Sequence, residues 1–200
     1  MKIMDDVKLM TLAKGYCLRY HENQFRKNGE PYHNHPIRVQ EILKKYGYDD
    51  VVTQCVALLH DVFEDTKIIR GRIKEEFGYE IANGVYVLSR NTISIKERDV
   101  ILNIMGFKIK DLSKDITPRE IVERLYKARL TFARSKILRV KIADMIDNTR
   151  DFGYLHITGI KRKIEDAKNF YIPLGKEIAP EMTKELEKNI EEYEKKTKGV

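Results

Sequence analysis

Acidic side chains and a histidine are gathered in one short run of this 200-residue chain. His60 and Asp61 end an apolar stretch, and Glu64 and Asp65 follow three and four residues after Asp61. Burying such charges beside apolar residues is costly unless a cation or other partners compensate for the lost hydration. The run therefore predicts a site that binds a metal ion or moves a proton.

His60 and Asp61 cannot complete a metal site by themselves. Neighbouring side chains on a helix diverge by about 100°, so both reach one ion only if it lies between them. Two protein ligands leave the coordination of a divalent ion incomplete, and further ligands must come from elsewhere in the chain. His33 and His35, in the polar loop that precedes Pro36, are candidates.

A second candidate set lies far along the chain. Asp144, Asp147, Asn148 and Asp151 recur at the spacing of one helix face, beside a separate apolar stripe. Like charges at this spacing repel by a few tenths of a kcal/mol, so a cation or a basic side chain is expected to neutralise them. This face is the other predicted source of metal ligands.

Each of these features also has a simpler interpretation. A His-Asp pair occurs by chance in many proteins, and Glu64 and Asp65 are typical of a helix cap and first turn. His33 is compatible with an exposed loop histidine. A loop histidine before proline, a His-Asp pair at a helix end, a Glu-Asp pair and a distant acidic helix face are together far more specific.

The elements that position these residues are predicted to be helices, because apolar residues recur at helical spacing and alternation is rare. Pro36 fits the first turn of one helix and Gly47 its end, while Asp49 or Asp50 is expected to cap the next helix, which leads to His60. The fold class is therefore all-α, a bundle of about 8–10 helices. Further helices are predicted at about 4–20, 66–77, 80–90, 95–105, 118–150, 156–176 and 178–196.

The length suggests one domain over residues 1–200. Its core is expected at about 8–178, and 179–200 form a C-terminal helix. The last 20 residues balance five Lys against six Glu, so this helix is predicted to be solvated.

The formal charge of +7 and the pI near 9.2 favour an acidic partner. The excess is local, since residues 119–141 hold five Arg and three Lys against two Glu. A solvated face explains this segment simply. A phosphorylated small molecule or nucleic acid also fits the charge, but no interleaving of aromatic and basic residues supports nucleic acid.

The location is predicted to be cytoplasmic. No stretch approaches the roughly 18 apolar residues that a spanning helix needs, and the N-terminus lacks the apolar region of a secretory signal. Cys17 and Cys55 lie far apart among apolar residues, which disfavours a disulfide framework and fits a reducing compartment. A membrane partner is not expected. The oligomeric state is not defined, and a homo-oligomer is compatible with the sequence.

Several blocks of residues resemble the HD superfamily of metal-dependent phosphohydrolases, and within it the RelA/SpoT-like (p)ppGpp hydrolases of the small stand-alone type. The resemblance covers about residues 8–178. Its blocks are Arg26-Lys27, Gly29, Pro31-Tyr32 and His35-Pro36; 57–61 with 64–66; Phe77-Gly78; 141–144 with Asn148 and Arg150; and, more weakly, 171–175.

The resemblance implies a Mn²⁺-dependent enzyme that removes pyrophosphate from the 3′ position of guanosine 3′,5′-bis(diphosphate) or a related alarmone, giving GDP or GTP. It implies that Glu64 and Asp65 position or deprotonate the attacking water. The implied metal ligands are His35, His60, Asp61 and Asp144. The implied or candidate substrate contacts are Arg26 and Lys27 to the base or phosphates, Asn148 in the pocket, and Lys141 and Arg150 to phosphate.

The chain departs from the alarmone pattern in three places. Val62-Phe63 replace Thr-Val, Asp147 replaces His or Tyr, and residues 91–135 match poorly. Asp147 is expected to repel a substrate phosphate or to reshape the base pocket. Three alternatives therefore stay open: a phosphohydrolase for another nucleotide, such as the 2′-phosphate of NADPH, a basic helical nucleic-acid-binding module, and a regulatory protein that binds an alarmone without hydrolysing it.

Overall fold

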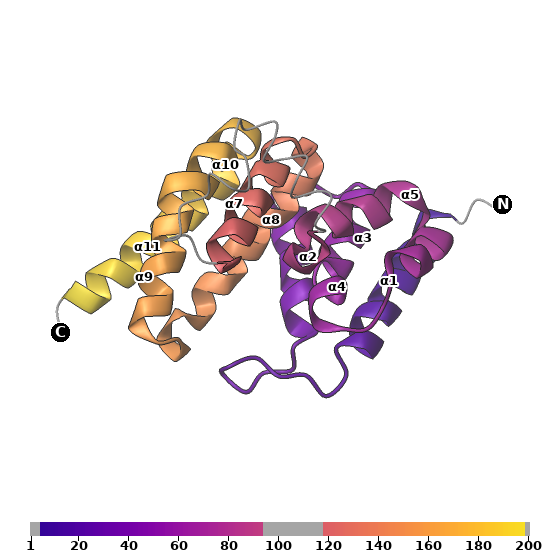
Figure 1. The fold of residues 1–200 in the computed structure, drawn as a ribbon, viewed down its shortest axis with the longest axis horizontal. Coiled ribbons are helices and arrows are strands. Elements are labelled where there is room, and N and C mark those ends of the chain that lie inside the picture. Colours follow the sequence, from indigo (N-terminus) through magenta and orange to yellow (C-terminus); the bar gives the residue numbers. More distant parts are fainter. Residues whose placement is uncertain (1–4, 94–117, 199–200) are drawn as a thin grey trace.

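The computed structural model describes residues 5–93 and 118–198. Within these ranges the regular elements are helices, and strand-like pairing is limited to an isolated antiparallel bridge between Phe25 and Pro31. The predicted all-α class is confirmed (Figure 1). The helix predicted at 95–105 lies outside the described residues.

The N-terminal half carries the helices that lead to the predicted metal ligands. Its elements are α1 (Asp6–Tyr20), α2 (Asn34–Lys45), α3 (Val51–Leu59), the single turn α4 (Val62–Asp65), α5 (Arg70–Leu88) and the 3₁₀ turn η1 (Arg90–Thr92). Gly78 interrupts α5 with a φ of 83°, which matches the two helices predicted on either side of it.

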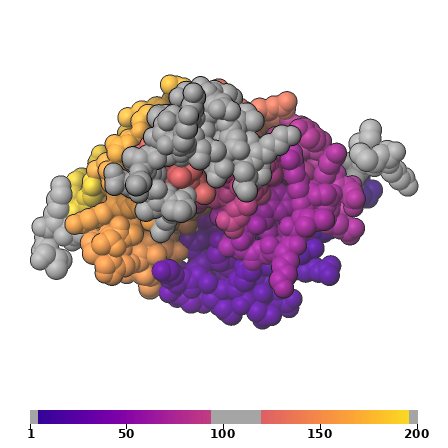
Figure 2. Space-filling view, in the orientation of Figure 1, coloured from indigo at the N-terminus to yellow at the C-terminus, as the bar shows by residue number. Residues whose placement is uncertain are grey.

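The C-terminal half continues the bundle. Its elements are α7 (Pro118–Thr131), α8 (Ser135–Asn148), the 3₁₀ turn η3 (Thr149–Tyr154), α9 (Ile157–Asp166), the π turn η4 (Ala167–Tyr171), α10 (Ile172–Ile178) and α11 (Pro180–Lys198). Space-filling shows the N-terminal half and the orange helices of this half as adjoining masses on the viewed face (Figure 2).

Helix α3 lies at the centre of the N-terminal half. The side chain of Asp50 caps it by accepting a hydrogen bond from the Thr53 amide (3.1 Å), as predicted. Every residue from 53 to 59 is buried, because α1, α2 and α5 all pack against this helix. Gly84 permits the close approach of α5, since a Cβ atom there would lie 2.7 Å from side-chain atoms of Val56 and Ile137.

Helix α2 has the start and end that its sequence predicts. Pro36 lies in the first turn, where its missing N–H removes no helical hydrogen bond. Gly47 follows the last turn with a φ of 76°, and the Tyr48 amide donates to the Leu43 carbonyl (3.0 Å). These caps place His35 at the beginning of α2.

Helix α8 joins the two halves of the bundle. It contacts α2, α3 and α5 on one side and α10 and α11 on the other, and it runs through the middle of the molecule (Figure 1). The start of α2, the end of α3 and the middle of α8 therefore meet at one place.

The continuous helix predicted over 118–150 is wrong. The chain leaves the helix after Thr131, and Arg134 has an extended backbone (φ −65°, ψ 144°) before α8 begins. The sequence has no Gly or Pro at this break, and apolar helical spacing runs through it. Contacts with α5 accompany the turn, since Arg134 and Lys136 both pair with Glu80.

The helix predicted over 156–176 is also interrupted. Helix α9 ends at Asp166 and passes through a π turn into α10, with Pro173 at its start. Proline lacks the N–H that would continue the helical ladder, and its ring crowds the carbonyl four residues earlier. The wider π turn accommodates this proline.

The C-terminal helix is less solvated than predicted. Met182, Leu186 and Ile190 of α11 are buried at the spacing of one helix face, and α11 contacts α8 and α10. The balanced Lys and Glu residues occupy the rest of its surface. In the described parts of the chain, no helix combines the length and apolar character needed to cross a membrane.

Candidate active site

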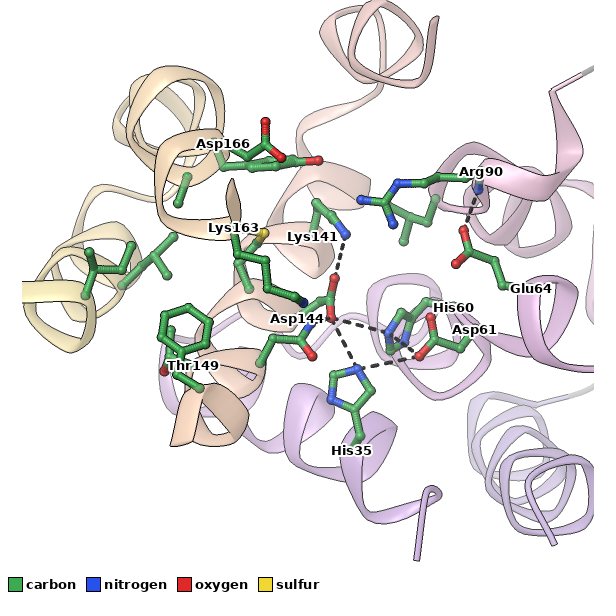
Figure 3. Close-up of a pocket in the computed structure, with 18 of the residues that line it drawn as sticks. His35, His60, Asp61, Glu64, Arg90, Lys141, Asp144, Thr149, Lys163 and Asp166 are labelled. Atoms are coloured by element: carbon green, nitrogen blue, oxygen red, sulfur yellow. Dashed lines mark hydrogen bonds and ion pairs between the residues drawn. The ribbon is translucent and has the colours of Figure 1, made fainter. Parts of the chain in front are cut away.

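Four predicted metal ligands meet where α2, α3 and α8 converge. His35 comes from the first turn of α2, His60 and Asp61 from the end of α3, and Asp144 from the middle of α8. The Nε2 atom of His35 lies 3.2 Å from Asp144 Oδ1 and 3.5 Å from Asp61 Oδ2. The Nε2 atom of His60 lies 3.2 Å from Asp61 Oδ2, and all four side chains surround one point (Figure 3).

The two histidines are held with Nε2 toward this point. The Nδ1 atom of His60 donates to the Ala57 carbonyl (2.7 Å), and Nδ1 of His35 bonds Asp147 Oδ2 (2.7 Å). A carbonyl can only accept a hydrogen bond, so neutral His60 presents a lone pair at Nε2. Metal-binding histidines are commonly fixed through the other ring nitrogen in this way.

The donor set fits a divalent metal ion. His60 Nε2 is buried and has no hydrogen-bond partner among the described residues, an uncommon state for a native polar atom. His35, His60 and Asp144 each offer a ligand atom, and these atoms lie within 4.8 Å of one another. Two imidazoles and two carboxylates suit several first-row divalent ions.

Charged neighbours adjust the protonation of these ligands. Burial lowers the pKa of His60, but Asp61 and Asp144 outweigh it and raise this pKa to about 9. Burial raises the pKa of Asp61, but His60 and His35 hold it well below its ordinary value. The carboxylate is therefore ready to bind a cation, whereas His60 must lose a proton first.

Asp144 is held by its own helix. Its Oδ2 atom accepts from Lys141 (2.7 Å) and its Oδ1 atom from Asn148 (2.5 Å). Burial would raise the pKa of Asp144, but Lys141 and His35 lower it well below its ordinary value. The acidic helix face predicted from the sequence thus includes its own neutralising lysine.

Asp147 lies behind His35 and does not line the cavity beside the candidate metal ligands. Its expected effect on a substrate phosphate or on the base pocket stays a prediction. Its side chain is fully buried, accepts hydrogen bonds from His35 and from Arg38 Nε (2.6 Å), and forms an ion pair with Arg150 Nε (3.2 Å). Arg38 also pairs with Glu30. This carboxylate orients a metal ligand and is itself held by two arginines.

Glu64 and Asp65 differ in their positions. Glu64 lines the cavity beside the metal ligands, and its carboxylate accepts a hydrogen bond from the Arg90 amide. Burial raises the pKa of Glu64, although this hydrogen bond opposes the shift. Asp65 is not part of the cavity wall, and its carbonyl accepts from the Gln24 side chain (2.9 Å).

A cavity of about 190 Å³ opens beside the metal ligands. Three cationic side chains, Arg90, Lys141 and Lys163, line it and reach toward the space around Asp144 (Figure 3). Burial lowers the pKa of Lys163, and the nearby Asp144 only partly opposes this shift. A cavity with metal ligands on one wall and cations on another is suited to a phosphate group.

The structure brings some predicted substrate residues to this cavity and not others. Asn148 and Lys141 line it. Arg26 instead bonds Asn148 (2.8 Å) and pairs with Asp151, which ties the loop before α2 to the end of α8. Lys27 is exposed, and Arg150 is 62% exposed with its guanidinium on Asp147.

Sequence reasoning missed Arg90 and Lys163. Arg90 lies just before the stretch that matches the family pattern poorly, and Lys163 is one of several basic residues on the helix predicted over 156–176. Neither residue lies in a motif or at a spacing that would have identified it as part of a site. Folding brings η1 and α9 to the cavity that α8 also lines, and that tertiary arrangement was the missing information.

The basic segment 119–141 is largely used in local contacts. Arg129 is buried and donates to the carbonyls of Tyr86 and Ser89 at the end of α5 (both 3.0 Å). Lys127 pairs with Asp166, and Arg139 donates to the Ile178 carbonyl (3.2 Å). These contacts spread the charge around two helices instead of forming one basic stripe.

Comparison with known proteins agrees with this site. A family model described as the HD domain matches residues 13–177. The chain is 32% identical over 180 residues to GTP pyrophosphokinase rsh of Brucella melitensis, covering 90% of this chain and 22% of that protein. It is 32% identical over 169 residues to the guanosine-3′,5′-bis(diphosphate) 3′-pyrophosphohydrolase of Haemophilus influenzae, covering 84% and 22%.

A solved structure shares the fold. It is described as a metazoan ortholog of SpoT that hydrolyses ppGpp, and it superposes with a TM-score of 0.70 at 21% identity over 92% of this chain and 95% of that one. The curated relatives are much longer, and the chain spans about a fifth of their length. The match of the family model over most of the chain shows that this protein belongs to the HD domain family.

Proposed function

We propose that this protein is a metal-dependent phosphohydrolase that removes pyrophosphate from the 3′ position of guanosine 3′,5′-bis(diphosphate) or a related alarmone. The observation that carries the proposal is the convergence of His35, His60, Asp61 and Asp144 beside a cation-lined cavity. The names of the relatives from Haemophilus influenzae and Borreliella burgdorferi support the choice of substrate.

The metal we propose is Mn²⁺, held by His35, His60, Asp61 and Asp144. When bound, it would supply a Lewis acid that polarises a phosphoryl oxygen and lowers the pKa of a bound water. The ligand set also accepts other divalent ions, so the choice of Mn²⁺ rests on the family resemblance.

Glu64 is the residue we assign to the attacking water. Burial shifts the pKa of this carboxylate in the direction of neutral pH, which makes it a stronger base for accepting a proton from water. The water oxygen forms a bond to the phosphorus on the 3′ oxygen, the bond from that phosphorus to the 3′ oxygen breaks, and the 3′ oxygen receives a proton. A role for Asp65 stays a prediction.

Three cations would bind the phosphates of the leaving group. Lys141 keeps Asp144 in place, and its ammonium has further donors for a phosphate oxygen. Arg90 and Lys163 line the same cavity from η1 and α9. Asn148 lies between this cavity and Arg26 and is a candidate contact for the sugar or base.

A nucleotide panel tests the proposal. Purified protein with Mn²⁺ or Mg²⁺ is incubated with guanosine 3′,5′-bis(diphosphate), its 5′-triphosphate form and NADPH, and the products are separated by ion-exchange chromatography. The expected products are GDP or GTP with pyrophosphate. Release of phosphate from NADPH alone would assign the site to another nucleotide, and no release from any alarmone would refute the proposal.

The cellular setting also stays a proposal. Both cysteines are buried and free, in agreement with a reducing cytoplasm. A homo-oligomer is compatible with the fold, and measuring the mass in solution by light scattering decides it.

A further inference from the structure

A second cavity, of about 690 Å³, adjoins the proposed active site. It shares Arg90, Lys163 and Asp166 with the first cavity, and its other walls come from α7 and α9. The shared residues make the two spaces neighbours. A molecule with one end at the metal ligands can therefore extend its other end into the second cavity.

The walls of this second cavity carry five cationic side chains against three acidic ones, Glu120, Glu123 and Asp166. Arg90 is 3.1 Å from Glu123, and Lys127 is 2.5 Å from Asp166, so these two are paired. Arg124, Arg162 and Lys163 also line the cavity, and within the described chain none of the three forms an ion pair, although Asp144 interacts electrostatically with Lys163. An anion with several charges would satisfy them.

We propose that the second cavity binds the phosphate arm that is not hydrolysed, which in guanosine 3′,5′-bis(diphosphate) is the 5′-diphosphate. This inference rests on the proposed function and specifies how the same site recognises its substrate. A nucleotide phosphorylated at two positions cannot place both arms at one metal ion. Arginine is suited to the second arm, because its guanidinium forms paired hydrogen bonds to phosphate oxygens.

The shape and location of the cavity favour a bound phosphate arm over a solvated surface. Arg124 and Arg162 come from different helices, α7 and α9, yet they line one concavity. Lys163 links this concavity to the wall of the metal site. Repulsion among unpaired cations makes the arrangement mildly unfavourable until an anion binds.

The test is a substrate comparison with an Arg124→Ala/Arg162→Ala double variant. Both side chains are exposed, so their removal is expected to leave the fold intact. Wild-type protein should lose about tenfold in kcat/KM, mainly through KM, when guanosine 3′-diphosphate replaces the full substrate. The double variant should show the same loss on the full substrate and no further loss on the truncated one.

Lys161→Ala is the matched control. Lys161 is exposed on the same helix as Arg162 but lines neither cavity, and its removal should leave both substrates unaffected. Equal impairment of both substrates by the double variant would overturn the proposal. The double variant could instead be inhibited more weakly by inorganic pyrophosphate than wild type while still losing kcat/KM when the 5′ phosphates are absent. That result would assign the cavity to the leaving group and would also overturn the proposal.

Binding of GDP separates this inference from the proposed activity. Titration calorimetry with metal-free protein needs no turnover, and the double variant should bind GDP about tenfold more weakly than wild type. If no alarmone is hydrolysed but GDP binding shows this loss, only the reaction assignment fails. Equal GDP binding by wild type and the double variant would refute the second subsite.

Discussion

The metal-ligand cluster and the cationic walls of the two cavities use charge in opposite ways. In the cluster, Asp144 already accepts hydrogen bonds from Lys141 and Asn148, and Asp61 accepts one from Tyr32 (2.9 Å). In the walls, Lys163, Arg124 and Arg162 form no ion pair within the described chain. The acids of the first region already have partners within the protein, whereas the second region has cations that we propose a phosphate binds.

This difference follows from burial. The cluster lies in the core where α2, α3 and α8 meet, and a buried charge without a partner is costly. Arg124 and Arg162 are exposed, and water hydrates an unpaired cation there at little cost. Mutations in the cluster should therefore change metal binding and stability, whereas mutations in the walls should change substrate affinity.

Removal of a proposed metal ligand should have the largest effect. Asp61→Ala removes a carboxylate that lies beside both histidines. Metal affinity should fall by more than the roughly 10²-fold that removal of a supporting residue costs. Metal content by mass spectrometry and turnover should both fall to background. Full metal occupancy in this variant would contradict the ligand assignment.

Glu64→Gln should separate chemistry from metal binding. The amide can still accept the hydrogen bond from the Arg90 amide but cannot take a proton, so turnover should fall roughly 10²- to 10⁴-fold with the metal retained. Asp65→Asn serves as a comparison and should lose less, because Asp65 does not line the cavity. Equal losses in both variants would give the two acids a shared role.

Asp147→Asn tests whether the cluster depends on its supporting contacts. Without its negative charge, residue 147 would hold His35 and Arg38 less firmly, and metal affinity should fall about 10- to 100-fold. The measurement is calorimetric titration with Mn²⁺, with circular dichroism to check the fold. Arg150→Gln should have a much smaller effect because Arg150 is largely exposed, and unchanged affinity in Asp147→Asn would argue against a supporting role.

The pH dependence of binding should differ between the two regions. Below the pKa of about 9, metal-free His60 is protonated, so each metal ion must displace a proton. Metal affinity should then rise about tenfold per pH unit between pH 7.5 and 8.5 and level off above pH 9. The difference in GDP binding between wild type and the Arg124→Ala/Arg162→Ala variant should change little over this range, because arginine stays charged. Metal affinity that does not vary with pH would contradict protonation of His60.

Local sequence signals predicted the elements that end at identifiable residues. Asp50 caps α3, Gly47 ends α2, and Gly78 interrupts α5, each through chemistry that acts within a few residues. The break at Arg134 carries no such signal, and the sequence pattern predicted one long helix instead. Contacts with a different helix accompany that turn, so a local pattern could not reveal it.

The site shows the same division. His35, His60, Asp61 and Asp144 were identifiable because their residue types and motif blocks are specific. Arg90 and Lys163 were not, since an arginine or lysine on a basic helical chain is ordinary until folding brings it to a cavity. Asp147 was identified as a departure from the family pattern, but its contact with Nδ1 of His35 is visible only in the folded protein.

The sequence by itself therefore determined the helical class through the spacing of its apolar residues, and its resemblance to the HD family predicted the ligand set and the acid beside it. Only the tertiary structure decided which charges are already compensated. Arg26 and Arg150 pair with acidic residues, whereas Arg124 and Arg162 form no ion pair within the described residues, which is why we propose them as phosphate contacts. Pairing depends on distances between segments far apart in the chain, and those distances exist only after the helices have packed.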